Sequence, residues 1–197
     1  MPVTINGDGS ITGLSVGGLG SGVVNTATLA NGAATGAKLG TGSVIQKVQN
    51  LTYTRAAINS TTFVATAHSV TITPTLASSK ILLNFSSVIN TNANSARAFV
   101  DVYRSINGGT FTGIAPMGSA GTTGANNSHG FLDGVRGDSS RIQVPFNIHY
   151  LDSPSYSVGN AIVYKLYIRT NDTSYTIELP TNNNLGPVVN MATEVKG

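Results

Sequence analysis

The chain has 197 residues and a formal net charge of +3, with 40% hydrophobic and only 10% charged residues. Its lysines and arginines are scattered singly, which argues against a nucleic-acid-binding surface, since such surfaces need clustered positive charge. The absence of cysteine excludes disulfides and thiolate metal sites, and it fits assembly in a reducing cytoplasm. No secretory signal or apolar run of ~20 residues is evident, so we expect no membrane insertion.

Residues 1–21 form a small, glycine-rich segment. Asn6-Gly7 followed by Asp8-Gly9 predicts tight turns. The segment is too short and too poor in apolar bulk to form its own core, so we expect order only where a partner holds it. We interpret residues 1–21 as an anchor, with a disordered tail as the alternative.

Residues 22–44 repeat with a period of ten, which glycines mark at Gly22, Gly32 and Gly42. Each decad predicts a short helical turn followed by a glycine turn, with Thr35 as an N-cap and Gly40 in the left-handed region. Such turns do not persist alone in water, so we expect the same stretch of other chains to pack against them around a shared axis. The alternative is a flexible linker. The residues predicted to face the axis are Val24, Ala27, Leu29, Ala34, Ala37, Leu39 and Val44.

Residues 45–197 carry alternating apolar and polar residues, typical of strands. We expect Pro145 to mark an edge strand. No segment keeps a period of 3.6, so the sequence predicts an all-β fold, a β-sandwich or jelly roll, as a head on the short repeat stalk. The predicted strand residues are Phe63 to Ile72, Ile81 to Phe85, Phe99 to Tyr103, Ile142 to Tyr150, Ile162 to Ile168, Tyr175 to Leu179, and Val189, Met191 and Val195.

The whole chain resembles small fibre proteins of bacteriophages, especially phages of cyanobacteria and marine bacteria. The resemblance lies in the opening Val3-Thr-Ile-Asn-Gly-Asp-Gly, in the decads, in Ser78-Ser-Lys-Ile-Leu-Leu and Tyr150-Leu-Asp-Ser-Pro, and in the final Glu194-Val-Lys-Gly. It implies a homotrimeric virion fibre assembled in the host cytoplasm: an anchor at residues 1–21, a stalk at 22–44 and a head at 45–197. The stalk has barely two complete decads, which favours a short projection.

The sequence offers little support for catalysis. Gly137-Asp-Ser-Ser is similar to the opening of certain esterases, but it lies mid-chain between predicted strands, where a surface turn is expected. A glycan depolymerase needs a pair of carboxylates, and no acidic residues lie close together in sequence. The histidines His68, His129 and His149 are far apart and are expected at the surface, so we predict no metal and no cofactor. We expect a protein that is not an enzyme.

Loop residues that can stack on or hydrogen-bond a sugar are the candidates for binding a host surface polysaccharide. The predicted glycan-binding residues are Asn126, Asn127, His129, Arg136, Tyr156, Asn182 and Asn183. The leading hypothesis is a short tail fibre that binds this glycan during adsorption. The alternative is a capsid-mounted head fibre or decoration protein, and a small depolymerase or esterase ranks below both.

Overall fold

The computed structural model describes residues 4–8, 11–12, 34–93, 95–114, 131–136, 142–180 and 186–197, with the backbone alone for residues 5, 11, 12 and 132–136. The chain divides into two compact units, Met1–Leu39 and Gly40–Gly197. The two units are described separately.

The first unit contains a small antiparallel pair, β1 (Thr4–Ile5) with β2 (Ile11–Thr12), and one turn of 3₁₀ helix, η1 (Gly36–Lys38). Thr35 occupies the N-cap position of η1, as predicted, although its side chain makes no capping hydrogen bond.

The predicted axis residues lie only partly within the described chain. Ala34, Ala37 and Leu39 are exposed at η1, and Val44, the first residue of the second unit's first strand, is 61% exposed. Val24, Ala27 and Leu29 lie outside the described residues. The shared axis therefore stays a prediction. Gly40 was expected in the left-handed region, but among the described residues 34–44 the glycine with a positive φ is Gly42, at 86°.

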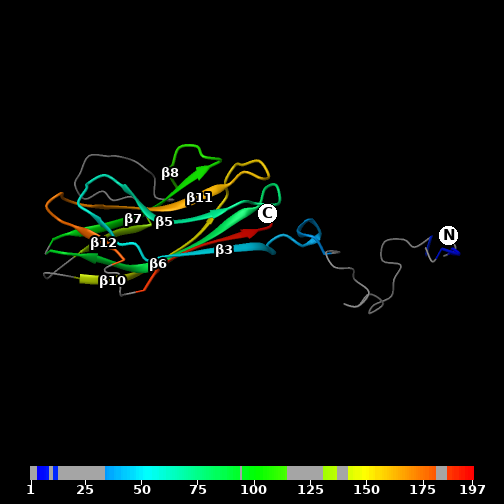
Figure 1. The fold of residues 1–197 in the computed structure, drawn as a ribbon, viewed down its shortest axis with the longest axis horizontal. Coiled ribbons are helices and arrows are strands. Elements are labelled where there is room, and N and C mark those ends of the chain that lie inside the picture. The colour runs from blue at the N-terminus through cyan, green and yellow to red at the C-terminus, as the bar shows by residue number, and fades with distance from the viewer. Residues whose placement is uncertain are drawn as a thin grey trace. The chain divides into compact units, whose positions relative to one another are not determined.

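The second unit consists of two antiparallel sheets (Figure 1). The six-stranded sheet runs β3-β13-β6-β12-β4, with β10 on the free side of β6, and the five-stranded sheet runs β5-β11-β7-β8, with β9 also paired to β7. Strands of the first sheet are β3 (Val44–Thr52), β4 (Ala56–Ile58), β6 (Lys80–Thr91), β10 (Ile142–Asp152), β12 (Ile177–Leu179) and β13 (Val188–Val195). Strands of the second sheet are β5 (Val64–Ile72), β7 (Arg97–Ile106), β8 (Thr112–Gly113), β9 (Leu132–Arg136) and β11 (Ile162–Thr170).

One hydrophobic core lies between these sheets, because alternate residues of both point into it. Leu83 and Phe85 of β6 meet Val100 of β7 and Leu166 of β11 in a single buried cluster. The all-β prediction is thereby confirmed, and the arrangement is sandwich-like. Pro145 is exposed on β10, which pairs only with β6 among the described strands, so the predicted edge position is correct.

The buried face of β13 does not coincide with the apolar residues that indicated this strand in the sequence. Val189 and Met191 are only half-buried, whereas Asn190 and Glu194 are fully buried. The pattern of apolar residues misleads here because hydrogen bonds satisfy the polar groups of the inner face, which makes burial of an amide and a carboxylate tolerable.

The chain enters and leaves the second unit at the same end. The Gly42 N–H donates to the Lys196 carbonyl at 2.8 Å, and the Lys196 N–H donates to the Ser43 carbonyl at 2.9 Å. The loops after β5, β7 and β10 lie at this entry end, whereas β6 and β11 finish at the opposite end.

Candidate binding surface

The outer side of the five-stranded sheet carries a cluster of aromatic side chains. Along β7, Ala98, Val100 and Val102 face the core, so the alternate residues Phe99 and Tyr103 stand on the opposite side. Tyr167 of β11 lies on that side too, because it pairs directly with Asp101 of β7. We call this cluster the aromatic face, and its residues are Phe63, Phe99, Tyr103, Phe111 and Tyr167.

The rings of the aromatic face pack against one another. Tyr103 and Tyr167 are stacked, with centroids 3.9 Å apart and planes at 20°. Phe63 lies 6.1 Å from Tyr103, and Phe111 lies 6.1 Å from Tyr167. Both tyrosine rings are half-buried, and burial raises the pKa of each hydroxyl. Mutual packing fixes the rings in place while part of their surface stays open to solvent.

Two cations of β11 flank Tyr167 on this face. The Lys165 ammonium lies 4.9 Å from the centroid of Phe111, and the Arg169 guanidinium lies 4.1 Å from that of Phe99. Cation–π contacts of this kind hold a long side chain over a ring without cancelling its charge.

Asp101 lies at the base of the aromatic face and is only 6% exposed. Its Oδ1 accepts the Val102 N–H at 2.7 Å, and burial raises the pKa of its carboxyl from 3.8 to about 6. Its Oδ2 faces Gly113, where an added Cβ would lie 3.0 Å away. The missing side chain of Gly113 thus leaves room for this carboxylate.

The other buried acids are held inside the protein by several hydrogen bonds. Asp152 accepts from the Arg104 guanidinium at 2.7 and 2.8 Å and from the Tyr164 hydroxyl at 2.7 Å. Burial, followed by the neighbouring Asp152 charge, raises the pKa of Tyr164, so this hydroxyl stays protonated and donates. These contacts account for Asp152 as a structural group.

Glu194 is fully buried near the entry end. Its carboxylate accepts the backbone N–H groups of Thr75 and Leu76 at 3.0 Å, the Ser79 hydroxyl at 2.8 Å and the Gln46 amide at 2.7 Å. Burial alone would raise the pKa of this group, but the hydrogen bonds outweigh burial and lower it. Glu194 therefore fixes the loop between β5 and β6.

The expectation that His68 lies at the surface is wrong, because this side chain is 0% exposed between the sheets. Its Nε2 lies 3.0 Å from the Leu179 carbonyl, which can only accept, so Nε2 carries the hydrogen. Its Nδ1 then accepts the Thr52 hydroxyl at 2.7 Å, and Thr52 accepts the Asn190 amide at 3.0 Å. Burial lowers the pKa of the imidazole, so His68 is a neutral core residue.

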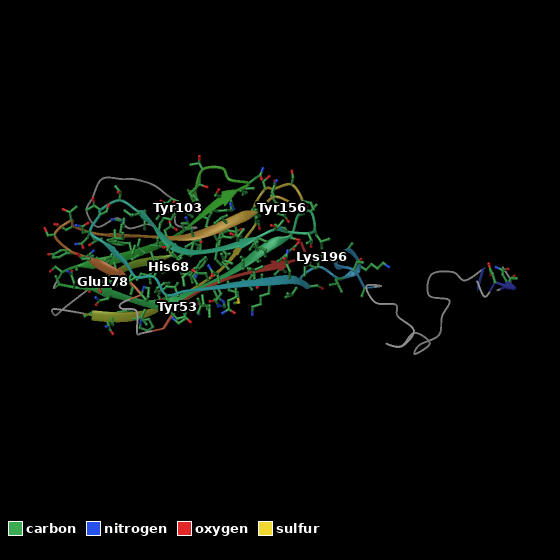
Figure 2. All side chains as sticks on the ribbon, in the orientation of Figure 1. Tyr53, His68, Tyr103, Tyr156, Glu178 and Lys196 are labelled. Carbon is green, nitrogen blue, oxygen red and sulfur yellow. The ribbon has the colours of Figure 1, made fainter. Side chains whose placement is uncertain are left out.

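A shallow depression of about 670 Å³ lies beside Tyr53, Thr54, Arg55 and Ala57. Arg55 forms an ion pair with Glu178, whose other oxygen accepts the Asn90 amide at 3.0 Å. Figure 2 shows Tyr53 and Tyr103 on opposite sides of the second unit, with His68 between them. The pairing of Glu178 with Arg55 and Asn90 gives this carboxylate a structural role.

The predicted glycan-binding residues do not come together in the described chain. Arg136 is the last residue of β9, whereas Tyr156 lies in the loop at the entry end, where its hydroxyl donates to the Leu76 carbonyl at 2.7 Å. This contact and its packing against the core account for the position of Tyr156. Asn126, Asn127, His129, Asn182 and Asn183 lie outside the described residues, so their role stays a prediction.

Sequence reasoning missed the aromatic face because it searched loops for binding residues. A signal was present, since Phe99 and Tyr103 alternate with the core residues of one strand, and Lys165, Tyr167 and Arg169 do so in another. Only the register of β7 against β11 reveals that these sets adjoin.

Comparison of the chain with known protein families, characterised proteins and solved structures gives no match. Within the described residues, no group of three or more His, Cys, Asp or Glu side chains is placed to hold a metal ion. The described part of the chain also has no helix that is long and apolar enough to cross a membrane.

Proposed function

We propose that the protein is a homotrimeric virion fibre protein of a bacteriophage, whose β-sheet head adheres to a glycan on the host surface. Residues 1–21 anchor it to another virion protein, residues 22–44 form the stalk, and the role is structural and adhesive rather than catalytic. The resemblance of the anchor and decads to phage fibre proteins supports this proposal.

The adhesive part of the proposal depends on the aromatic face. Flat, fixed rings on an outer sheet surface suit the apolar face of a sugar ring, and tyrosine adds a polar group at its edge. Tyr103 and Tyr167 are half-buried, so part of each ring is open to a partner, whereas Phe99 is only 1% exposed and supports the cluster. Copies of the face in one fibre gain avidity on a host surface that repeats its epitope.

The path of the chain supports a projecting head. The hydrogen bonds between Gly42, Ser43 and Lys196 bring both ends of the second unit together. This end of the second unit is therefore where its first strand, β3, begins and where β13 finishes. A head whose two ends meet in this way can be joined to an anchor through a single connection.

Association of copies is supported by the outer side of the six-stranded sheet. Leu82 and Leu151 are direct cross-strand partners there, and they are 37% and 45% exposed. Leu51, on the same side, is 44% exposed. We call these residues the aliphatic face. Leu82 and Leu151 are adjacent, whereas Leu51 lies two strands away on the same side. An exposed apolar pair of this kind is a candidate subunit contact.

Removal of the head from the virion tests the proposal. Particles whose copy of this protein ends after Val44 should assemble and remain intact but lose adsorption to the host. The full-length protein added in trans should compete with wild-type particles for adsorption. Unchanged adsorption together with a less stable capsid would contradict this proposal and favour a capsid decoration protein.

A further inference from the structure

We propose that the depression beside Tyr53 binds an uncharged sugar, with the sugar ring stacked on Tyr53 and its hydroxyl groups bonded to the Arg55 guanidinium. This inference rests on the proposed glycan-adhesive function for its biological role. It adds a second sugar site to the head, on the side of the second unit opposite Tyr103 of the aromatic face (Figure 2).

The depression lies where the chain crosses from β3 to β4. β3 ends at Thr52 and β4 begins at Ala56. β3 begins at the entry end, so this crossing lies toward the opposite end of the second unit. The volume of about 670 Å³ is in the range of small-ligand sites. The described lining residues are Tyr53, Thr54, Arg55 and Ala57.

Tyr53 provides the stacking surface of the depression. It is 56% exposed, and no ring of another described residue packs against it. One face of a sugar ring is apolar and its edge carries hydroxyl groups, so it stacks on an aromatic ring that has hydrogen-bonding groups beside it. Thr54 and Arg55, the next two residues of the chain, supply such groups.

The Arg55 guanidinium is held in place by the neighbouring strands. It forms an ion pair with Glu178, and the two side chains are 44% and 9% exposed. Glu178 of β12 is the register partner of both Ala57 of β4 and Asn90 of β6. The Asn90 amide donates to the second carboxylate oxygen of Glu178 at 3.0 Å. Because a guanidinium has five N–H donors, Arg55 can bond Glu178 and still donate to a ligand.

Asn90 indicates that this support has a cost. The residue is 0% exposed, and its Oδ1 has no hydrogen-bond partner among the described residues. An unsatisfied buried acceptor lowers stability. The amide nitrogen is nevertheless directed at Glu178, and supporting contacts of this kind are expected beneath a group that must be held in position for binding.

The ion pair favours an uncharged ligand. Because the Arg55 charge is matched by Glu178, the pair offers hydrogen-bond donors with little net charge. An anion would compete with Glu178 for the guanidinium, whereas a hydroxyl group accepts a remaining N–H and leaves the pair intact. The Thr54 side chain is exposed, and its hydroxyl both donates and accepts, as sugar hydroxyls do. Recognition of such a ligand does not depend on the other charges of the head.

A second copy of the chain is the alternative occupant, because tyrosine and arginine are also enriched at protein–protein contacts. Subunit contacts are favoured by contiguous apolar side chains. Tyr53, in contrast, is the one large ring among the described lining residues, and Thr54 and Arg55 beside it are polar. The sugar therefore fits better, and self-association is an outcome that the experiment must separate.

Soluble oligosaccharides test the site, since each occupies one site at a time and avidity is excluded. Uncharged oligosaccharides of glucose, galactose, mannose and rhamnose are titrated into the full-length protein by calorimetry. At least one should bind, and added salt should leave its affinity unchanged. Tyr53→Ala should weaken this binding about five- to tenfold, in the wild-type and in the Tyr167→Ala background. Arg55→Lys keeps the charge but removes the guanidinium fork, and it should weaken binding about two- to fourfold.

Val158→Ala is the matched control. Val158 is 55% exposed, close to the value for Tyr53, but it lies in the loop after β10 at the entry end and is not among the described lining residues. Its replacement should leave sugar binding unchanged. Thermal unfolding verifies that each variant is folded, and sedimentation measures self-association.

The inference would be overturned if no member of the panel bound, or if Tyr53→Ala and Val158→Ala had equal effects. Loss of self-association in Tyr53→Ala with sugar binding unchanged would also overturn it, in favour of a subunit contact. Sugar binding that survives in Tyr53→Ala but is lost in Tyr167→Ala would overturn it as well, and would leave the adhesive function of the aromatic face intact. That function fails instead if removal of the head leaves adsorption unchanged.

Discussion

Two buried carboxylates, Glu194 near the entry end and Asp101 under the aromatic face, show how differently the same chemical group is treated within one head. Glu194 is 0% exposed and accepts hydrogen bonds from the loop between β5 and β6 and from Gln46. Asp101 is 6% exposed, and its carboxylate accepts the N–H of the next residue, Val102. The pKa is lowered at Glu194 and raised to about 6 at Asp101.

The difference separates structural acids from an acid kept at a surface for another reason. A buried carboxylate with several donors stabilises the fold, because the donors replace the water that it has lost. A buried carboxylate with a single donor costs stability at neutral pH. Burial of the Asp101 carboxylate is unfavourable, and it occurs directly under the aromatic face. Such unfavourable burial is expected where a surface serves binding rather than stability.

Replacement of Glu194 is expected to have the largest effect on stability. Glu194→Gln turns one acceptor into an N–H₂ group that faces backbone donors, so the free energy of unfolding should fall by about 3 kcal/mol at pH 7. Because the folded-state pKa of Glu194 lies below its usual 4.5, its stabilisation is present above pH 4.5 and is lost as the pH falls through the folded-state pKa.

Urea unfolding of Glu194→Gln beside Asp172→Asn measures this effect. Asp172 is exposed and accepts the Ser174 N–H at 2.8 Å, so its replacement controls for the change in net charge and should cost below about 0.5 kcal/mol. If Glu194→Gln is as stable as that control, the hydrogen bonds to Glu194 do not stabilise the fold, and the contrast with Asp101 does not hold.

How much of this the sequence could predict depends on whether burial follows hydrophobicity. The strands β6, β7, β10 and β11 were predicted because their apolar residues alternate. By contrast, β3 was missed, since Gln46 and Asn50 donate to partners across the core edge and leave no alternating apolar pattern. His68 was misjudged for the same reason, because its hydrogen-bond partners are distant in sequence.

The aromatic face could not be assembled from the sequence for a related reason. Tyr103 and Tyr167 lie far apart in the chain and meet only through the register of β7 against β11. Nothing local to either strand fixes that register. The predicted loop residues, in contrast, were chosen by residue type alone, and Tyr156 shows that such a residue can serve a purely internal contact.

Replacement of Asp101 is expected to raise the free energy of unfolding, whereas replacement of Glu194 should lower it. Asp101→Asn removes the buried charge and keeps an oxygen that accepts the Val102 N–H. At pH 7 its free energy of unfolding should therefore exceed that of the wild-type protein by about 1 to 2 kcal/mol. The folded-state pKa is raised from 3.8 to about 6. Protonation of Asp101 therefore stabilises the wild-type protein fully below pH 3.8, and this contribution is lost as the pH rises through 6.

Unfolding of both proteins at pH 7 and pH 5 checks the sign. The advantage of Asp101→Asn should shrink by roughly 1 kcal/mol at pH 5, where the wild-type carboxyl is mostly protonated. The same comparison with Asp172→Asn should show no such change. Loss of stability at pH 7 in Asp101→Asn would mean that the carboxylate is as well satisfied as Glu194, and the comparison would fail.

The smallest effect concerns Gly113, which makes room for Asp101. Its φ lies outside the left-handed region, so Gly113→Ala should by itself stabilise the protein by about 0.5 kcal/mol through the unfolded chain. The new Cβ, however, would lie 3.0 Å from Oδ2 of Asp101, closer than ordinary contact, and the carboxylate would have to shift. We expect the gain to be cancelled in the wild-type background and to appear in Asp101→Ala, a coupling of about 0.5 to 1 kcal/mol.

Gly40→Ala is the control, since its Cβ would meet nothing within 4 Å, and its effect should be the same in both backgrounds. A gain from Gly113→Ala that is independent of Asp101 would show that the carboxylate moves freely, and the carboxylate would then not be held in place under the rings.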